Sequence, residues 1–541
     1  MYSIIPTAVV CGIESIIVKV EADVCDGMPV FEMVGELSSE VREAKERIRA
    51  AIRNTGIKLN PKRITVNLYP ADLRKSGTGF DLPIAMAILV AYEMVHPKQI
   101  KDTLFVGEVS LNGDIHPVNG ILPIVLAAKE AGYKRIVIPK GNEREAAFVK
   151  NIQIIAIGKL ADILAGLEHV KNSTNQKSTN ESSPNQESAN QNNPNQESAN
   201  ENNRTSNSSN NNIEETALNT KNMEIDFAAI NGQNVLRRAC EVAAAGMHNM
   251  LMIGPPGSGK TLAASAIPSI LPPLNEEEAM EVAKIYSVSG LFDTRAGLFA
   301  RPFRNPHHTI SATALAGGGA IPKPGEISLS HGGVLFLDEL TEFKKATLET
   351  LRQPLEEHSI QIVRISGTYR YPADFMLLAA INPCNCGYYP DRNKCRCSTT
   401  VIQRHLDKIS RPLLDRIDIC IEAPRMKIRD LTTTVPNENS DTIRKRVENA
   451  HAIQKERYKK TNFYYNSQIP GSEVKNYCLM ETKAEKLMEQ AFDKMNLSAR
   501  AYYKIIKTAR TIADLGKSET ILELHVQEAL MYRSMDVHLW G

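Results

Sequence analysis

The chain has 541 residues, of which 42% are hydrophobic and 23% are charged. This length predicts three or four domains, and the composition excludes a mainly disordered, collagenous or coiled-coil protein. The 64 basic and 62 acidic residues give a formal net charge of +2. A nucleic-acid site would therefore have to be a local basic patch.

The longest apolar runs, such as residues 82–90, are far shorter than the ~20 residues that span a bilayer, and no basic signal region precedes them. Four of the nine cysteines lie close together at 384–397. This spacing fits a reducing compartment better than a disulfide framework. These features predict a cytoplasmic protein that has no membrane partner.

Residues 1–168 mix strand-like and helical patterns, which predicts an α/β or α+β domain. Strands are expected at 16–20, 64–68, 135–139 and 153–157, and helices at 39–54, 83–93 and 121–131.

Residues 169–222 consist mainly of Asn, Gln, Ser, Glu and Thr, with a ten-residue repeat that begins at Pro184 and again at Pro194. Such a segment cannot bury enough apolar surface to offset its ordering entropy. It is predicted to be a disordered linker between two independently folded parts.

A complete phosphate loop of the form G-x-x-x-x-G-K-T follows an apolar strand predicted at 250–253 and precedes a helix-prone segment at 262–266. In such loops backbone N–H groups surround phosphate oxygens, the lysine reaches the β and γ phosphates, and the threonine hydroxyl binds Mg²⁺. The sequence therefore predicts ATP and Mg²⁺ as cofactors. The loop residues are Gly254, Pro255, Pro256, Gly257, Ser258, Gly259, Lys260 and Thr261.

Two further apolar strands, predicted at 333–337 and 375–381, end in polar side chains. After the first, Asp338 would hold Mg²⁺ and Glu339 would polarise the attacking water. After the second, the Asn382 amide could orient the same water, although a capping role before Pro383 is the alternative.

Strands that end in phosphate and metal chemistry indicate a parallel sheet covered by helices. Residues 223–425 are expected to form this ATPase core. Helical patterns at 440–460, 481–495 and 499–515 predict a small helical domain at 426–541.

The clustered cysteines form two C-x-C pairs separated by eight residues, and Gly387 and Asp391 permit a tight loop between them. Four thiolates suit tetrahedral zinc, so a structural zinc knuckle is expected at 384–397. Free thiols in a surface insertion are the alternative. The candidate ligands are Cys384, Cys386, Cys395 and Cys397.

From about Met223 the chain resembles AAA+ ATPases of the magnesium-chelatase-like group, and nearly the whole chain except the linker resembles the ComM/YifB family. The resemblance implies that Asn382 is the sensor 1 residue, Arg416 the arginine finger and Arg500 the sensor 2 arginine. An arginine finger acts on the γ phosphate of a neighbouring subunit, so the resemblance implies a ring, expected to be a hexamer.

The alternative for Arg416 is a surface salt bridge with Asp415 or Asp418. The segment at 301–309, which contains His307 and His308, resembles an insert of the family within the ATPase core. Adjacent histidines on an extended strand would point to opposite faces, which disfavours a shared metal. A loop that touches DNA or the neighbouring subunit is expected, with a packing role as the alternative.

A hairpin predicted from 360–364 and 368–371 resembles the pre-sensor hairpin that related rings direct into their central pore. Arg364 and Arg370 on this hairpin would then meet DNA phosphates. Exposed arginines are also common on hairpins that bind nothing.

The N-terminal domain resembles the Lon-protease fold, but both positions of the Ser–Lys dyad differ. The nucleophile position holds Gly79 and the lysine position holds Leu122. Neither side chain can attack a carbonyl or accept a proton. Thr78 offers a hydroxyl, but no base is expected beside it. The domain is expected to be protease-inactive and to serve DNA binding or ring assembly.

The ComM resemblance implies an ATP-hydrolysing ring motor that acts on single-stranded or branched DNA, with branch migration or helicase activity in the recombination of incoming DNA. The alternative is the ATPase subunit of a metal-chelatase-like complex, which powers insertion of Mg²⁺ into a tetrapyrrole. The Lon-like domain and the cysteine cluster favour the motor, because a chelatase ATPase subunit is not expected to carry either.

Overall fold

The computed structural model describes residues 1–163, 225–293, 299–319, 322–364, 367–425, 437–533 and 539–540. The chain forms two compact units, one of residues 1–220 with 290–297 and the other of residues 221–289 with 298–541. The linker predicted at 169–222 and the domain boundary predicted at 426 lie outside the described residues. No helix in the described part of the chain is long and apolar enough to cross a bilayer.

The first unit is built on a four-stranded sheet with the order β1-β2-β4-β3. Helix α1 (Ser39–Asn54) packs on helix α2 (Asp81–Ala91), which is buried along its whole length and lies against β1 and β2. The buried Asp81 carboxylate is paired with Arg47 of α1 at 2.8 Å. The strands are β1 (Tyr2–Cys11), β2 (Glu14–Cys25), β3 (Phe31–Val34) and β4 (Arg63–Tyr69).

A second, parallel sheet of this unit has the order β5-β8-β9, and helix α3 (Ile121–Glu130) follows a short hairpin of β6 and β7. The predicted elements of this unit are confirmed, although α2 begins and ends two residues before the helix predicted at 83–93. The remaining bounds are β5 (Thr103–Phe105), β6 (Glu108–Val109), β7 (Ile115–His116), β8 (Arg135–Pro139) and β9 (Gln153–Ile157).

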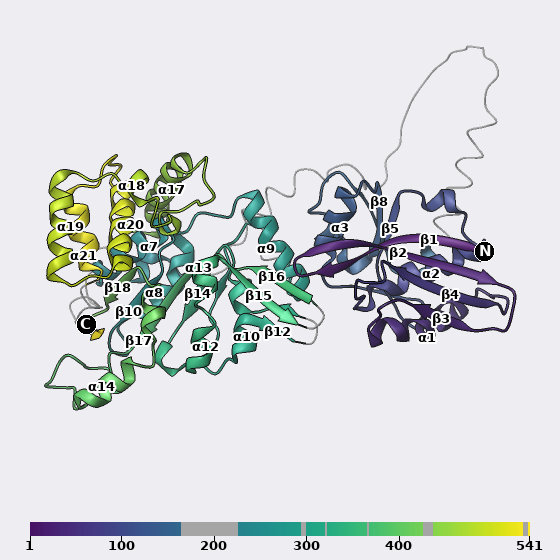
Figure 1. Ribbon diagram of the computed structural model, residues 1–541, viewed down its shortest axis with the longest axis horizontal. Coiled ribbons are helices and arrows are strands. Elements are labelled where there is room, and N and C mark those ends of the chain that lie inside the picture. The colour runs from purple at the N-terminus through teal and green to yellow at the C-terminus, as the bar shows by residue number, and fades with distance from the viewer. Residues whose placement is uncertain are drawn as a thin grey trace, which may run out of the picture. The chain divides into compact units, whose positions relative to one another are not determined.

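The second unit contains a five-stranded parallel sheet with the order β11-β14-β17-β10-β18 (Figure 1). Its inner strands are continuous apolar runs because helices cover both faces of such a sheet. The predicted parallel α/β core is confirmed. The strands are β10 (Met250–Ile253), β11 (Phe303–Arg304), β14 (Val334–Leu337), β17 (Met376–Ile381) and β18 (Ile419–Glu422).

The C-terminal helices lie together beside β10 and β18 (Figure 1). They share one hydrophobic core with the sheet, in which Val447, Ile505 and Val526 belong to the same cluster as Met250 and Met252. The helices are α17 (Ser440–Arg457), α19 (Thr482–Lys494), α20 (Ala499–Leu515) and α21 (Glu523–Met531), with α7 (Asn234–Gly246) packed on α17 and α20.

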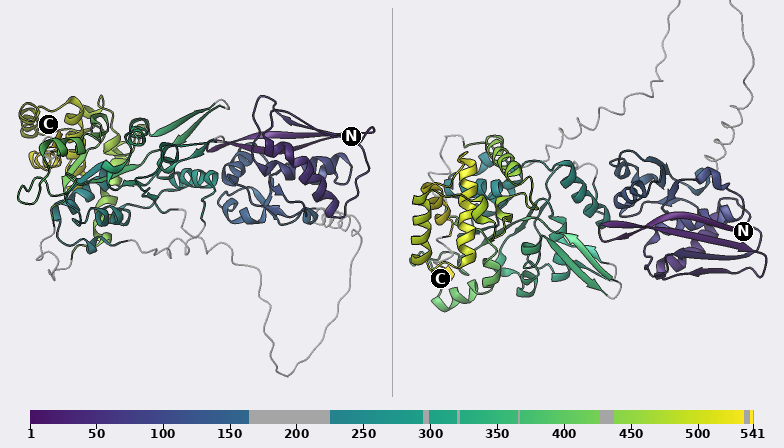
Figure 2. Two further views of the ribbon diagram at one scale, coloured as in Figure 1. Left: turned by 90° about the horizontal axis from the view of Figure 1, so that it is seen from below. Right: turned by 45° about the horizontal axis from the view of Figure 1, so that its top comes forward.

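The predicted hairpin is present as β15 (Ser359–Arg364) and β16 (Gly367–Pro372), which form a separate two-stranded ribbon (Figure 1; Figure 2). Gln361 faces Arg370 in the antiparallel register. Only residues 373–375 separate β16 from β17, so the hairpin runs directly into the strand that ends at Asn382.

Candidate active site

The phosphate loop lies at the carboxyl end of β10, the strand between β17 and β18. It borders a cavity of about 380 Å³, which Asp338, Glu339 and Asn382 also line. Gly257 and Gly259 have φ of 73° and 84°, a region that glycine adopts without steric cost. The sheet order thus brings all three predicted strand ends to one cavity, which fits the phosphates of a nucleotide.

Lys260 is the first residue of α8 (Lys260–Ala266) and is 8% exposed. Its Nζ donates to the carbonyl oxygens of Gly254 at 2.7 Å and Pro255 at 3.0 Å, and to Oδ1 of Asn382 at 3.3 Å. Burial lowers the pKa of Lys260, and the carboxylates of Asp338 and Glu339 counteract this effect. The ammonium group is therefore held at the cavity wall, ready to exchange carbonyl contacts for phosphate oxygens.

The two predicted magnesium ligands touch each other, since Thr261 Oγ1 donates to Asp338 Oδ2 at 2.7 Å. Hydroxyl and carboxylate oxygens are the ligands that Mg²⁺ prefers, and Mg²⁺ usually takes few protein ligands beside substrate phosphates. These residues fit the metal. Thr261 and Asp338 would hold the ion, which would supply positive charge to offset that of the phosphates.

Glu339 adopts a left-handed backbone conformation with φ of 52°, which is uncommon for a residue with a side chain. Its backbone N–H donates to Asp338 Oδ1 at 2.9 Å, and its side chain is 55% exposed. Such strained residues cluster at functional sites. In this conformation Asp338 reaches Thr261, and the neighbouring Glu339 also lines the cavity.

Asn382 directs its side-chain oxygen at Lys260, and its own carbonyl oxygen accepts a hydrogen bond from His405 Nε2 at 3.0 Å. The side chain is thus a member of the cavity wall, as expected for a water-orienting residue, and its hydrogen bond goes to the ammonium group of the loop lysine.

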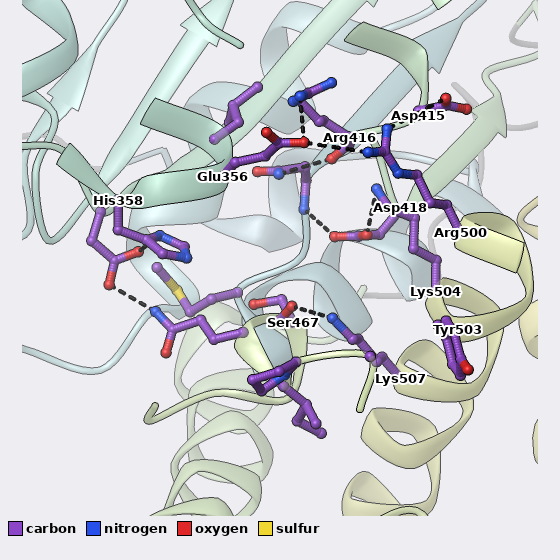
Figure 3. Close-up of a pocket in the computed structure, with 18 of the residues that line it drawn as sticks. Glu356, His358, Asp415, Arg416, Asp418, Ser467, Arg500, Tyr503, Lys504 and Lys507 are labelled. Atoms are coloured by element: carbon purple, nitrogen blue, oxygen red, sulfur yellow. Dashed lines mark hydrogen bonds and ion pairs between the residues drawn. The ribbon is translucent and has the colours of Figure 1, made fainter. Parts of the chain in front are cut away.

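A second cavity of about 370 Å³ contains Arg416, the predicted arginine finger, and Arg500, the predicted sensor 2 arginine (Figure 3). Arg416 is 9% exposed, donates to the carbonyl oxygens of Arg352 at 3.1 Å and of Pro412, and pairs with Glu356. Arg500 of α20 is 63% exposed and also approaches Glu356, at 3.8 Å.

Arg416 does form an ion pair within its own chain, as the alternative expected, but the Arg416 side chain is buried and its partner is Glu356 instead of Asp415 or Asp418. Asp415 lies 3.9 Å from Arg500, and Asp418 pairs with Lys504 at 2.9 Å (Figure 3). Glu356, which sequence reasoning missed, takes the Arg416 pair instead. Glu356 lies on α13 (Pro354–Glu357) beside Glu357, and this local sequence gives no signal of a pair with a residue 60 positions away.

Within the described part of the chain, the phosphate-loop cavity and the arginine cavity share no lining residue. Neither Arg416 nor Arg500 lines the phosphate-loop cavity of its own chain. This separation is the arrangement that an arginine acting on a neighbour's nucleotide requires.

The four clustered cysteines have Sγ atoms that all lie within 4.8 Å of one another. Cys384 Sγ is 3.3 Å from Cys386 Sγ and 3.7 Å from Cys395 Sγ. In a tetrahedral site with Zn–S bonds of about 2.3 Å the sulfur atoms are about 3.8 Å apart. The backbone N–H of Tyr388 lowers the pKa of Cys386 to about 7. The donor set and its spacing therefore fit zinc.

The two histidines of the insert were expected on opposite faces of an extended strand. This expectation is wrong, because neither histidine lies in a strand. Strand β11 ends at Arg304, and the chain turns at His308 and Thr309. The two imidazole rings lie next to each other, with centroids 4.1 Å apart and their planes tilted by 35°. His308 Nδ1 is 3.8 Å from Glu339 Oε2, a contact that sequence reasoning missed because the two residues are 31 positions apart.

In the first unit, Gly79 lies in a short helix (Thr78–Phe80), and Leu122 is fully buried on α3. The expectation that Thr78 has no base beside it is wrong, because Thr78 Oγ1 donates to the Glu108 carboxylate. Glu108 lies on β6, which the sequence analysis did not predict as a strand. Position 122, where the dyad lysine would stand, holds a core leucine.

The phosphate loop on β10, the acidic pair after β14 and the asparagine after β17, all on one five-stranded parallel sheet, define an ATPase of the AAA+ class. Residues 226–431 match the family model described as magnesium chelatase, subunit ChlI. Residues 437–533 match the model of the ChlI C-terminal region, and residues 20–142 match a model described as subunit ChlI of Mg-chelatase.

The protein YifB of Escherichia coli (strain K12) is 37% identical over 541 residues, which cover 99% of this chain and 98% of that protein. Competence protein ComM of Haemophilus influenzae is 38% identical over 532 residues, 97% of this chain and 96% of that protein. Lon protease 2 of Bacillus subtilis is 28% identical over 146 residues, 26% of each chain. The chain belongs to the ComM/YifB family of magnesium-chelatase-like AAA+ ATPases, and its N-terminal part is Lon-like.

Proposed function

We propose that the protein is an ATP-hydrolysing ring motor that moves on single-stranded or branched DNA. Branch migration or helicase activity in the recombination of incoming DNA, in the cytoplasm, is its proposed role. The similarity to a relative named competence protein supports this role. The Lon-like unit, with Gly79 and Leu122 at the dyad positions, is proposed to be a protease-inactive scaffold.

The observation that carries the DNA proposal is the hairpin of β15 and β16. Arg364 and Arg370 are both exposed on it, and the register places Arg370 beside Gln361 while Arg364 faces Gly367. Because side chains alternate along a strand, the two arginines point to opposite faces of the hairpin. DNA that passes either face of the hairpin would therefore meet one guanidinium group.

The proposal that the subunits assemble into a ring is based on the cavity that contains Arg416 and Arg500. Arg416 and Arg500 approach one carboxylate, Glu356, at a site away from the phosphate loop of the same chain. In the proposed assembly, a hexamer, the phosphates of the neighbouring subunit's ATP would replace Glu356 as the partner of these guanidinium groups.

DNA should raise the rate of ATP hydrolysis, and replacing both hairpin arginines (Arg364→Ala with Arg370→Ala) should remove most of that increase. The measurement is steady-state hydrolysis by the full chain with no DNA and with single-stranded, duplex and forked DNA. The affinity for DNA should fall as salt rises, because each neutralised phosphate releases counterions.

The matched control is Lys459→Ala, which removes a side chain of the same charge that is 72% exposed after the end of α17. This variant should respond to DNA as the wild type does. Equal hydrolysis by the wild type with and without every DNA would contradict the proposal.

A metal-chelatase ATPase subunit is the second candidate, and the descriptions of the three matching family models favour it. Because residues 20–142 match a model described as subunit ChlI of Mg-chelatase, the presence of the Lon-like domain no longer argues against a chelatase subunit. An ATPase that ignores DNA and instead responds to a porphyrin together with chelatase partner subunits would establish this candidate.

We also propose that the cysteine cluster binds one structural Zn²⁺. A Cβ at Gly387 would overlap the ring of Pro256 in the phosphate loop, so the metal-bound loop would pack directly against the nucleotide site. Its role would be to hold this loop in place at the end of β17.

Protein purified without chelator should contain about one zinc per chain, and Cys384→Ser should lose the metal and melt at a lower temperature. Cys25→Ser, which changes an exposed thiol of the first unit, should keep both properties. Metal-free wild-type protein with four titratable thiols and the same stability as Cys384→Ser would rule out the zinc site.

A further inference from the structure

We propose that His405 is a positioning residue of the ATPase reaction, which fixes the backbone at Asn382 and thereby aims the Asn382 amide into the phosphate-loop cavity. The inference rests on the proposed function only in that Asn382 orients the attacking water of ATP hydrolysis. It requires neither DNA nor zinc, and it adds a residue that sequence reasoning missed.

The first observation is a hydrogen bond to the backbone of Asn382. His405 Nε2 lies 3.0 Å from the Asn382 carbonyl oxygen, and because a carbonyl oxygen can only accept, the imidazole nitrogen is the donor. The next residue is Pro383, which has no backbone N–H. The peptide unit that joins Asn382 to Pro383 can therefore be held by a hydrogen bond only at the carbonyl oxygen that His405 contacts.

The second observation is that Asn382 lies one residue beyond the strand ladder. The pairing of β17 with β10 ends at Ile381, whose carbonyl oxygen accepts from the backbone N–H of Gly254 at 3.1 Å. The sheet thus restrains the chain up to Ile381, and the bond from His405 restrains the residue that follows. A fixed backbone at this point keeps the direction of the Asn382 side chain, whose Oδ1 lies 3.3 Å from Lys260 Nζ.

The third observation is that the imidazole is itself held in place. His405 lies on helix α14 (Thr399–Leu406) and is 5% exposed, and together with Ile402 and Leu406 it forms the buried face of this helix. The end of the helix is anchored, because Trp540 Nε1 donates to the Leu406 carbonyl oxygen at 3.4 Å. A donor on a packed helix face keeps its direction, as a positioning residue requires.

The fourth observation distinguishes His405 from a histidine that only fills space in the core. Burial lowers the pKa of His405, so the ring is neutral and its Nδ1 carries a lone pair. This nitrogen is buried and has no hydrogen-bond partner within the described part of the chain. Burying it costs free energy that an apolar side chain of similar size would not cost. The bond from Nε2 to Asn382 is the polar contact that offsets this cost.

The position of His405 relative to the site is the fifth observation. A cavity of about 310 Å³ is lined by His405 together with Glu339 and Asn382, and the latter two residues also line the phosphate-loop cavity, which His405 does not reach. His405 therefore lies behind the two side chains that would meet the attacking water. It can act on the reaction through Asn382 without touching the nucleotide.

The test is basal ATP hydrolysis by variants of His405 in the full chain. His405→Phe keeps a ring but removes the donor, and should lower kcat about tenfold, the rate equivalent of one well-made hydrogen bond. KM for ATP should stay near the wild-type value, because His405 does not line the phosphate-loop cavity. His405→Gln carries an amide N–H with the reach of the imidazole Nε2 and should restore most of kcat.

A double-mutant cycle with Asn382→Ala separates positioning from a general loss of structure. Asn382→Ala removes the amide that His405 aims but keeps the backbone carbonyl oxygen. The variant that carries both His405→Phe and Asn382→Ala should therefore be no slower than Asn382→Ala alone, because residues that act through one another are not additive. If His405→Phe does not fold, His405→Asn replaces it, since its shorter amide cannot reach Asn382.

The matched control is Ile402→Val, which trims one methyl group from the same buried face of α14. It should lower the melting temperature slightly and leave kcat unchanged, because the donor of His405 is intact.

Losses that multiply in the double variant, or a wild-type kcat in His405→Phe, would overturn the inference. A wild-type rate in Asn382→Ala would overturn it as well, because His405 would then have no catalytic side chain to position. The failure of the DNA proposal is a different result. A wild-type protein that ignores DNA refutes the motor, while the cycle on basal hydrolysis still reports on His405.

Discussion

The Glu339→Gln protein should bind ATP about as tightly as the wild type but hydrolyse it at least about 100-fold more slowly, which is the usual contribution of a positioned general base. The amide keeps the shape of the side chain at the cavity wall, whereas the basicity needed to polarise water is lost. Because Lys260 and Thr261 are unchanged, the phosphates and Mg²⁺ should still bind. Nucleotide affinity by equilibrium titration and single-turnover hydrolysis measure the two properties separately.

Lys260→Ala should behave differently, since its Nζ is the cationic group held at the cavity wall by Gly254 and Pro255. We expect this variant to lose nucleotide affinity, and with it hydrolysis. The two variants thus separate binding from chemistry.

The matched control for Glu339→Gln is Glu342→Gln. Glu342 belongs to the same segment and lies 3.4 Å from Lys408 at the surface, but it does not line the phosphate-loop cavity. Its turnover should be near that of the wild type. Wild-type hydrolysis by Glu339→Gln would refute the assignment of the general base.

Arg416→Ala should lower hydrolysis by about a thousandfold, the lower end of what arginine fingers contribute. The physical reason is that its guanidinium group would stabilise the charge that develops on the γ phosphate of the neighbouring subunit. Glu356 holds the group in this structure. The phosphate loop of the same subunit stays intact, so nucleotide affinity should change little.

Mixing Arg416→Ala with Lys260→Ala should restore part of the activity, since some interfaces then combine an intact loop with an intact finger. Arg404→Ala, an exposed arginine on α14 (Thr399–Leu406), should be active without mixing. Mass measurement would show whether mixed assemblies form. If they form but never hydrolyse ATP faster than either variant alone, a role of Arg416 in trans is contradicted.

Much of the second unit could be predicted because local sequence dictates it. The phosphate loop needs glycines at the positive φ of Gly257 and Gly259, and the buried parallel strands are short apolar runs bounded by turn residues. Helix α20 has the predicted bounds because a Ser498 cap and a regular apolar stripe mark it.

Other elements gave weaker signals. Strand β1 contains Pro6, which removes a backbone donor and disfavours a strand in the interior of a sheet. It is tolerated because β1 is the edge of the order β1-β2-β4-β3. Helix α2 was predicted two residues late because Pro83 is a typical helix start, whereas Asp81 begins the helix and finds its partner in Arg47.

The sequence by itself determined the residue types of the ATP site, the missing dyad residues and the thiols of the cysteine cluster, because each depends on a short motif. Only the tertiary structure decided which of these groups meet. The contact of Thr261 with Asp338 spans 77 positions, and the sharing of Glu356 by Arg416 and Arg500 spans up to 144. Such pairs depend on strand order and helix packing. These are determined by the apolar surface that the whole core buries, which cannot be predicted from a short stretch of sequence.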